Sequence, residues 1–181
     1  MIPGPAMTFL ETERLLFRSH EPQDEPVFIA MHTDSEVRRY VGGKPWPLEK
    51  AQFRFRNQFL GRPIDAYGLW ATIFKEEANY IGCCGLRPGE HQAEAHLGFY
   101  LARPYWRRGF ASVASKAFID LAFTRLRLER LSAEVEKGNA PSEHILQKSG
   151  FKYISQEVIP ASGRILHSYE LTRIGWQKRG I

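Results

Sequence analysis

The sequence predicts an α/β or α+β fold, with a mixed central sheet of about seven strands flanked by roughly four or five helices. Three segments carry this prediction. Residues 94–101 alternate polar and apolar side chains, residues 109–125 form a long apolar helix, and residues 131–135 form a short apolar strand. A strand, a helix and a second strand in this order imply a parallel pair joined by a right-handed crossover.

The N-terminal third predicts one strand followed by helical segments. Residues 9–18 alternate as a first strand, and Asp24 is a favourable N-cap for the helix after it. Residues 34–39 form a shorter helical piece. Two glycines and two prolines make residues 40–47 a loop, whereas apolar residues at a spacing of four make residues 48–60 a third helix.

The rest of the chain predicts strands on both sides of the long helix. Short polar turns make the strands before that helix antiparallel neighbours. After it, Asn139 caps a helix that ends at Gly150. The predicted strands lie at residues 70–74, 80–86, 94–101, 131–135, 151–159 and 165–172.

The composition favours a single folded domain. Hydrophobic residues make up 43% of the 181 residues, which argues against disorder. Because no internal repeat or Gly/Ser linker is visible, we expect one domain over residues 1–181, with residues 1–8 as a flexible N-terminus. No apolar run approaches the ~18 residues that span a bilayer, and no secretory signal is visible, so we expect no membrane partner.

The charge and the cysteines indicate the kind of partner and the cellular compartment. The net charge of +5 favours anionic partners, but the basic residues are spread along the chain, so an RNA-associated protein is the weaker interpretation. Cys83 and Cys84 are adjacent, and neighbours on a strand point to opposite faces, so we expect reduced thiols rather than a disulfide or a redox pair. Reduced thiols predict a cytoplasmic protein. We expect no metal site.

The loop at residues 103–109 is the main candidate for ligand binding. Gly109 permits close approach of the backbone to a ligand, and the first amides of the following helix have no intrahelical acceptor. The helix dipole contributes about 0.3–1 kcal/mol per exposed anionic charge, and Arg107 and Arg108 add full positive charges. A pyrophosphate fits such a site. The alternative is an ordinary loop with two solvated arginines.

Five short motifs point to one family. Residues 106–111 read WRRGFA, which resembles the acyl-CoA-binding motif Q/R-x-x-G-x-G/A of the GNAT N-acetyltransferases. The others match in order: TERLLFR at 12–18, GFYL at 98–101, NAPS at 139–142 and KSGF at 148–151. Together they resemble the RimJ/RimL-like branch, which acetylates protein N-termini, and they cover nearly the whole chain.

This resemblance implies a GNAT fold in which the strand at 94–101 splays from the next parallel strand, with acetyl-CoA as the acetyl donor. The pantetheine arm would lie along the splayed strand like an added strand, and the pyrophosphate would lie against the helix amides. The cofactor-binding residues that it implies are Phe99, Tyr100, Leu101, Trp106, Arg107, Arg108, Gly109, Phe110, Ala111, Ser112, Asn139 and Ser142.

Trp106 stands where the general motif has Gln or Arg, which resembles the RimJ/RimL-like branch, and a second position departs from the pattern of relatives. Relatives usually carry glycine where Arg107 stands. If that position requires a positive φ, a residue other than glycine costs about 1–2 kcal/mol there. Either the backbone of this chain differs, or Arg107 gains a contact with a phosphate, which is the interpretation we favour.

The resemblance implies direct transfer of an acetyl group to a primary amine in a ternary complex. The partner is then a protein N-terminal α-amine or a small-molecule amine, and the assembly a homodimer. A non-catalytic acyl-CoA-binding module is the alternative.

Catalysis would require a proton acceptor and a proton donor. His96 and Glu94 share one face of the strand, and His96 is the first candidate base because it stands where relatives commonly carry glutamate. The alternative for His96 is a strand histidine without a role. Ser142 is the first candidate donor to the departing thiolate, with Tyr169 and Tyr100 behind it.

The acceptor pocket is expected in the variable segments, namely the loop at 40–46, the helix after it and the turn at 159–167. The candidate substrate-binding residues are Tyr40, Trp46, His167 and Tyr169, followed by Phe53 and Tyr67.

Overall fold

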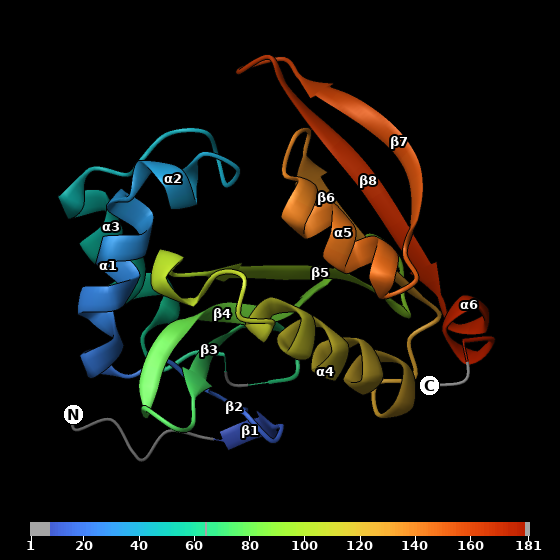
Figure 1. The fold of residues 1–181 in the computed structure, drawn as a ribbon, viewed down its shortest axis with the longest axis horizontal. Coiled ribbons are helices and arrows are strands. Elements are labelled where there is room, and N and C mark those ends of the chain that lie inside the picture. The colour runs from blue at the N-terminus through green and yellow to red at the C-terminus, as the bar shows by residue number, and fades with distance from the viewer. Residues whose placement is uncertain (1–7, 64, 180–181) are drawn as a thin grey trace.

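The computed structural model describes residues 8–63 and 65–179, and in these residues one eight-stranded sheet runs through the molecule in the order β1-β2-β3-β4-β5-β6-β8-β7 (Figure 1). The strands are β1 (Thr8–Glu11), β2 (Leu15–Arg18), β3 (Gly68–Phe74), β4 (Asn79–Pro88), β5 (Glu94–Leu101), β6 (Arg130–Glu136), β7 (Lys152–Ile159) and β8 (Arg164–Thr172). The α-helices are α1 (Glu25–Thr33), α2 (Ser35–Arg38), α3 (Leu48–Arg54), α4 (Phe110–Thr124), α5 (Ala140–Lys148) and α6 (Arg173–Gln177). None of the helices in this part of the chain is long and apolar enough to cross a membrane.

The sheet has one parallel pair among its described strands, β5 and β6, which are joined through α4. They pair only over three positions, from Glu94 opposite Arg130 to His96 opposite Ser132. Beyond Ser132, β6 continues to Glu136 and pairs only with β8. The mixed α/β fold and the divergence of the two strands are therefore confirmed, and the divergence begins directly after His96.

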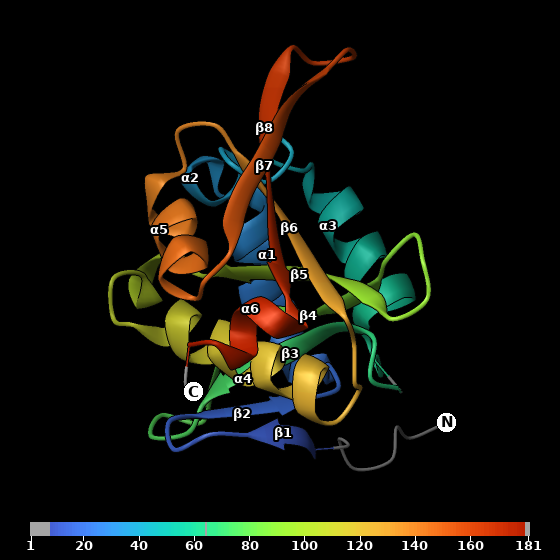
Figure 2. The same cartoon turned by 90° about the vertical axis from the view of Figure 1, so that its right-hand side faces the viewer.

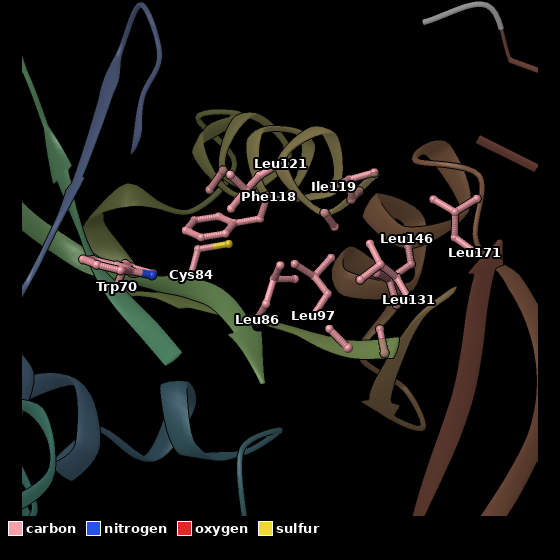
Figure 3. Close-up of a cluster of buried hydrophobic side chains, with 14 of the residues drawn as sticks. Trp70, Cys84, Leu86, Leu97, Phe118, Ile119, Leu121, Leu131, Leu146 and Leu171 are labelled. Carbon is pink, nitrogen blue, oxygen red and sulfur yellow. The ribbon is translucent and has the colours of Figure 1, made fainter. Parts of the chain in front are cut away.

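The two faces of the sheet carry separate cores. One core lies under α4 and contains Phe118, Trp70, Cys84 and Leu97, with Phe118 next to Cys84 (Figure 3). The other lies under α1 and α3 and contains Phe28, Phe55 and Cys83. Cys83 and Cys84 thus point to opposite faces, and both are buried free thiols, as expected from their adjacency.

The N-terminal strand prediction was wrong in one respect. Residues 9–18 do not form one strand, because Thr12 closes a tight turn: its N–H donates to the Leu15 carbonyl at 2.8 Å, and its hydroxyl accepts from the Leu15 N–H at 2.9 Å. The result is two antiparallel strands, β1 and β2, in place of one. Residues 1–7 lie outside the described residues, and Thr8 already belongs to β1.

The helices differ from the predictions in three respects. The Asp24 carboxylate does not cap α1; it accepts two hydrogen bonds from Arg18, at 2.7 and 2.8 Å, and one from the Glu21 N–H. The short helix α6 was not predicted, and the Thr172 hydroxyl caps it by accepting from the Gly175 N–H at 3.1 Å. The predicted helix at 48–60 consists of α3 and a π-helical turn over Phe55–Phe59.

Candidate functional site

The free edge of β5 is the first component of the site. Because β6 leaves β5 after His96, the edge that carries Phe99, Tyr100 and Leu101 has no strand beside it on that side (Figure 1). The Leu101 carbonyl is already taken, since it accepts the indole N–H of Trp106 at 2.7 Å. Trp106 therefore ties the loop after β5 to the end of that strand.

The loop before α4 forms a cradle of backbone amides. Arg107 and Gly109 both have left-handed backbones, with φ of 59° and 80°. The first amide that makes a helical hydrogen bond is that of Val113, which donates to the Gly109 carbonyl at 3.1 Å. Within the described residues, no acceptor is hydrogen-bonded to the amides of residues 107–112. Six free amides at the positive end of a helix fit a pyrophosphate.

The backbone at Arg107 resolves one of the two alternatives. Arg107 adopts the positive φ that a glycine would adopt, so the backbone does not differ there. The conformation costs about 1–2 kcal/mol for a side chain with a Cβ. The side chain is exposed, and no described carboxylate lies within ion-pair distance of it. Its strain is therefore not offset by an ion pair inside the described chain.

Substituting Arg107 by glycine separates strain from binding. We expect Arg107→Gly to raise the free energy of unfolding by about 1 kcal/mol, because glycine adopts the left-handed conformation without strain. If Arg107 contacts a phosphate, the same variant binds acetyl-CoA several-fold more weakly. Arg107→Lys is the control, since it keeps the charge and the strain. Denaturant unfolding and calorimetric titration measure both effects; acetyl-CoA binding by Arg107→Gly as tight as in the wild type would contradict a phosphate contact.

Arg14, which the sequence did not suggest as a site residue, supports this loop from the turn between β1 and β2. Its guanidinium donates to the Arg108 carbonyl at 3.2 Å and lies 4.3 Å from the ring centre of Phe110. Arg108 stacks on the same ring at 5.0 Å and has one carboxylate nearby, Glu77 at 3.8 Å. An exposed pair at this distance contributes little, so the N-terminus of α4 remains strongly cationic.

His96 occupies the position where the parallel pair ends. Its Nδ1 lies 3.3 Å from the Ser132 Oγ, which in turn lies 3.5 Å from the Ala95 carbonyl. A carbonyl accepts only, so both contacts are hydrogen bonds in one arrangement: the hydroxyl donates to Ala95, and Nδ1–H donates to the hydroxyl. In this arrangement Nε2, which has no hydrogen-bond partner among the described residues, is free to accept a proton. Burial, and secondly the charge of Arg87, lower the pKa of His96 to about 4, so the imidazole is neutral at pH 7.

Glu94 is less suited to act as a base. Its carboxylate forms an ion pair with Arg130, which also donates to Glu170 at 3.0 Å. Removing Glu94 from this pair would leave an arginine without one of its two partners. The structure therefore brings Glu94 and His96 onto the same face, but Glu94 is held in an ion pair with Arg130, whereas His96 is not.

Asn139 and Ser142 lie together at the N-terminus of α5. The Asn139 side chain accepts from the Ser142 N–H at 3.4 Å, as predicted for a helix cap. The half-buried Ser142 hydroxyl makes no hydrogen bond to another described residue. It is free to donate to a ligand.

The predicted acceptor residues fall into two groups. Trp46 stacks on the buried ring of His32 at 4.2 Å, and the loop that holds Tyr40 and Trp46 approaches β8, where the Arg164 side chain passes close to Gly43. These residues belong to the wall made by α1, α2 and the loop after them.

His167 and Tyr169 lie elsewhere. In the register of the sheet they sit opposite Val135 and Ala133, on the face of β6 that packs under α4 and α5. His167 Nδ1 contacts the Glu143 carboxylate on α5 at 2.7 Å, and Tyr169 is only 3% exposed. Ser132 and His96 point to the opposite face, so the structure does not bring His167 and Tyr169 together with the candidate base.

Two hollows lie on the face of the sheet that carries His96. The larger, about 780 Å³, lies between α1, the ends of β2 to β4 and Arg103–Tyr105, and contains neither His96 nor residues 107–112. The smaller, about 410 Å³, reaches Arg87, which is paired with His96 in the β4–β5 register. We therefore regard the smaller hollow as part of the site. It is lined by Gln58, Phe59, Arg62, Pro63, Asp65, Tyr67, Gly68, Leu69 and Arg87.

Comparison with known proteins agrees with this geometry. The family described as "Acetyltransferase (GNAT) domain" matches residues 14–152, more than half of the chain. An uncharacterized N-acetyltransferase, p20 of Bacillus licheniformis, is 32% identical over 169 residues, which cover 90% of this chain and 94% of that protein.

Solved structures show the same fold. A GNAT-family acetyltransferase from Bacillus anthracis superposes with a TM-score of 0.81 at 22% identity, covering 92% of this chain and 99% of that one. The spermidine N-acetyltransferase of Vibrio cholerae in complex with CoA and spermine superposes with a TM-score of 0.72 at 17% identity, covering 92% and 99%. These findings confirm the expectation of an acetyltransferase with acetyl-CoA as its donor: the chain belongs to the GNAT family of acetyltransferases.

Proposed function

We propose that this chain transfers an acetyl group from acetyl-CoA directly to a primary amine, with His96 as the proton acceptor. The observation that carries the proposal is the position of His96. It is the last residue of β5 that pairs with β6, next to the free edge of β5, and its Nε2 is uncommitted. The proposal extends to the RimJ/RimL-like branch, whose acceptors are protein N-terminal α-amines.

The residues around the divergence of β5 and β6 fit the donor. The free amides of residues 107–112 would hold the pyrophosphate, and the edge of β5 at Phe99 and Tyr100 would pair with the pantetheine arm. Acetyl-CoA supplies the acetyl group as a thioester. The free Ser142 hydroxyl, at the N-terminus of α5, would donate a hydrogen bond to the departing thiolate.

The weak basicity of His96 selects the kind of amine. An α-amine with a pKa near 8 needs about 1.4 kcal/mol to become neutral at pH 7, whereas a lysine near 10.4 needs roughly 4.6 kcal/mol. A base with a pKa of about 4 is too weak to deprotonate a lysine ammonium, so it accepts the proton only from an amine that is already neutral when it attacks. This favours an α-amine over a lysine or a polyamine.

Two peptides of one sequence test this choice. One has a free N-terminus and an acetylated lysine, and the other has a blocked N-terminus and a free lysine. With saturating acetyl-CoA at pH 7, we expect the α-amine peptide to be acetylated at least tenfold faster, since its amine is the less costly one to neutralise. Equal rates on the two peptides would contradict the α-amine assignment.

The cellular location and the oligomeric state of the protein remain predictions. Two buried free thiols support a reducing compartment, in line with the expected cytoplasmic location. Strand β7 is an outer strand of the sheet that exposes Tyr153, Ile154 and Val158, and its hairpin with β8 stands out from the body (Figure 2). An apolar free edge supports the homodimer, and analytical ultracentrifugation that finds only monomer would exclude it.

A further inference from the structure

The smaller hollow contains two arginines that the proposed chemistry does not use. Arg62 and Arg87 both line it, and neither pairs with a carboxylate of the described residues. Asp65 is the one acidic residue among those that line it, and its carboxylate accepts the Tyr67 N–H at 2.9 Å. The hollow therefore has an excess of positive charge.

Arg87 is the nearer of the two to the chemistry. It lies directly opposite His96 in the antiparallel register of β4 and β5, and residues opposite each other in such a pair have side chains on the same face. The charge of Arg87 also reaches the His96 ring, where it contributes to the lowered pKa. An acceptor whose amine lies at His96 thus has Arg87 on the neighbouring strand and on the same face of the sheet.

The surface next to Arg87 and His96 is formed by two glycines and the adjoining part of β3. The next pair along the same face is Gly85 opposite Gly98. A Cβ on Gly85 would collide with the Gly68 carbonyl oxygen, and a Cβ on Gly98 would lie 3.4 Å from the Leu69 side chain. Gly68 and Leu69 therefore lie over the two glycines, and both also line the smaller hollow together with Arg87.

From this arrangement we infer that the smaller hollow binds a carboxylate of the acceptor, so that the substrate is an amine carrying a carboxylate close to the amino group. A peptide with an acidic residue next to its N-terminus has this chemistry. Arg87 and Arg62 bind the carboxylate, and the position of Arg87 opposite His96 places the amine near the candidate base. A polycationic acceptor would be repelled by the same two charges. The inference rests on the proposed function and specifies the substrate class of that site.

A matched peptide pair tests the inference. The peptides share every residue except the second, which is glutamate in one and glutamine in the other, so that the reacting amines have closely similar pKa values. For the wild type we expect kcat/KM to be about tenfold higher for the glutamate peptide, mainly through KM, and the preference to shrink as salt is added. Arg87→Gln should abolish the preference without changing the affinity for acetyl-CoA, and Arg62→Gln should reduce it.

Two further variants serve as controls. Arg125→Gln removes an exposed arginine just after the C-terminus of α4 and should keep the full preference. Arg87→Lys keeps a positive charge and should keep part of it; if Arg87→Gln does not fold, Arg87→Lys and the wild type still decide the question.

Several results would overturn the inference. Equal kcat/KM for the two peptides in the wild type is one, and an unchanged preference in folded Arg87→Gln is another. If neither peptide reacts but other amines are acetylated, the inference fails and the proposed function stands. If acetyl-CoA is bound but no amine is acetylated, the proposed function fails, and the inference with it.

Discussion

Replacing His96 by alanine is expected to lower kcat by a factor of about 10² to 10⁴, the usual contribution of a positioned general base. The affinity for acetyl-CoA should not change, because the amides of residues 107–112 and the edge of β5 are left intact. The imidazole is held by the Ser132 hydroxyl with Nε2 free, and alanine offers no acceptor there. Steady-state kinetics at saturating acetyl-CoA, with a calorimetric titration of the donor, separates the two effects.

The pH dependence gives a second readout of His96. An unperturbed histidine would make the rate rise with pH near 6.5, but burial lowers the pKa of His96 to about 4. Between pH 5.5 and 7, His96 is therefore neutral, and the rate should follow only the deprotonation of the acceptor amine. An inflection near 6.5 that disappears in His96→Ala would show that His96 titrates normally and would contradict this environment.

Two variants control for effects unrelated to the base. His91 lies exposed in the turn before β5, and His91→Ala should leave kcat unchanged. Ser132→Ala removes the group that orients the ring and should lower kcat less than His96→Ala does. A loss in His91→Ala comparable to that in His96→Ala would contradict a specific role for His96.

Acid is expected to unfold the protein through two other histidines. His20 and His32 are only 1% and 2% exposed, and burial lowers their pKa values to about 4 and about 3. The unfolded chain, with histidine pKa values near 6.5, binds protons below that pH that the folded chain does not bind. The free energy of unfolding is therefore not reduced by these two histidines above pH 6.5. As the pH falls below 6.5, it decreases by about 1.4 kcal/mol per pH unit for each histidine.

The magnitude is large compared with the stability of a typical domain. From pH 6.5 to pH 4 the two histidines together remove on the order of 5–7 kcal/mol, against a total of roughly 5–15 kcal/mol for folded domains. Urea unfolding at several pH values measures the slope. A free energy of unfolding that does not change between pH 7 and pH 5 would contradict the burial of neutral imidazoles.

His32→Phe isolates one of these histidines. The His32 ring stacks on Trp46 with only 8° between the planes, and neither of its nitrogens has a partner in the described chain. Phenylalanine keeps the stacking and removes both unsatisfied nitrogens, so we expect stability at pH 7 to rise by about 1 kcal/mol and the pH slope to fall by one proton. His144→Phe, on the exposed side of α5, is the control for the introduced phenylalanine and should not raise stability at pH 7.

The unit made by β5, α4 and β6 could be predicted because its signals are local and agree with one another. Alternation marks β5, Gly109 marks the start of α4, and the apolar face of α4 follows the helical period. The turn at Thr12 was missed because it contains neither glycine nor proline and is closed by a threonine hydroxyl. The helix α6 is too short to show a helical period.

The candidate site could be predicted where its residues lie close together in the sequence and not where they come from separate elements. His96 and residues 107–112 follow one another along the chain, so a motif reveals them. Arg14 meets Arg108 across 94 residues, and Arg87 meets His96 only through the β4–β5 register. The same reason explains His167 and Tyr169: a shift of one residue in the pairing of β6 and β8 would turn both to the other face, and sequence spacing does not set that register.

The most direct test of the account is to measure both products of the reaction. Purified protein is incubated with acetyl-CoA and a peptide with a free α-amine, and free CoA thiol and acetylated peptide are quantified together. Direct transfer predicts that the two appear in equal amounts and that His96→Ala slows both alike. Acetyl-CoA binding without release of thiol, across a panel of peptide and small-molecule amines, would contradict the account and indicate a non-catalytic acyl-CoA-binding protein.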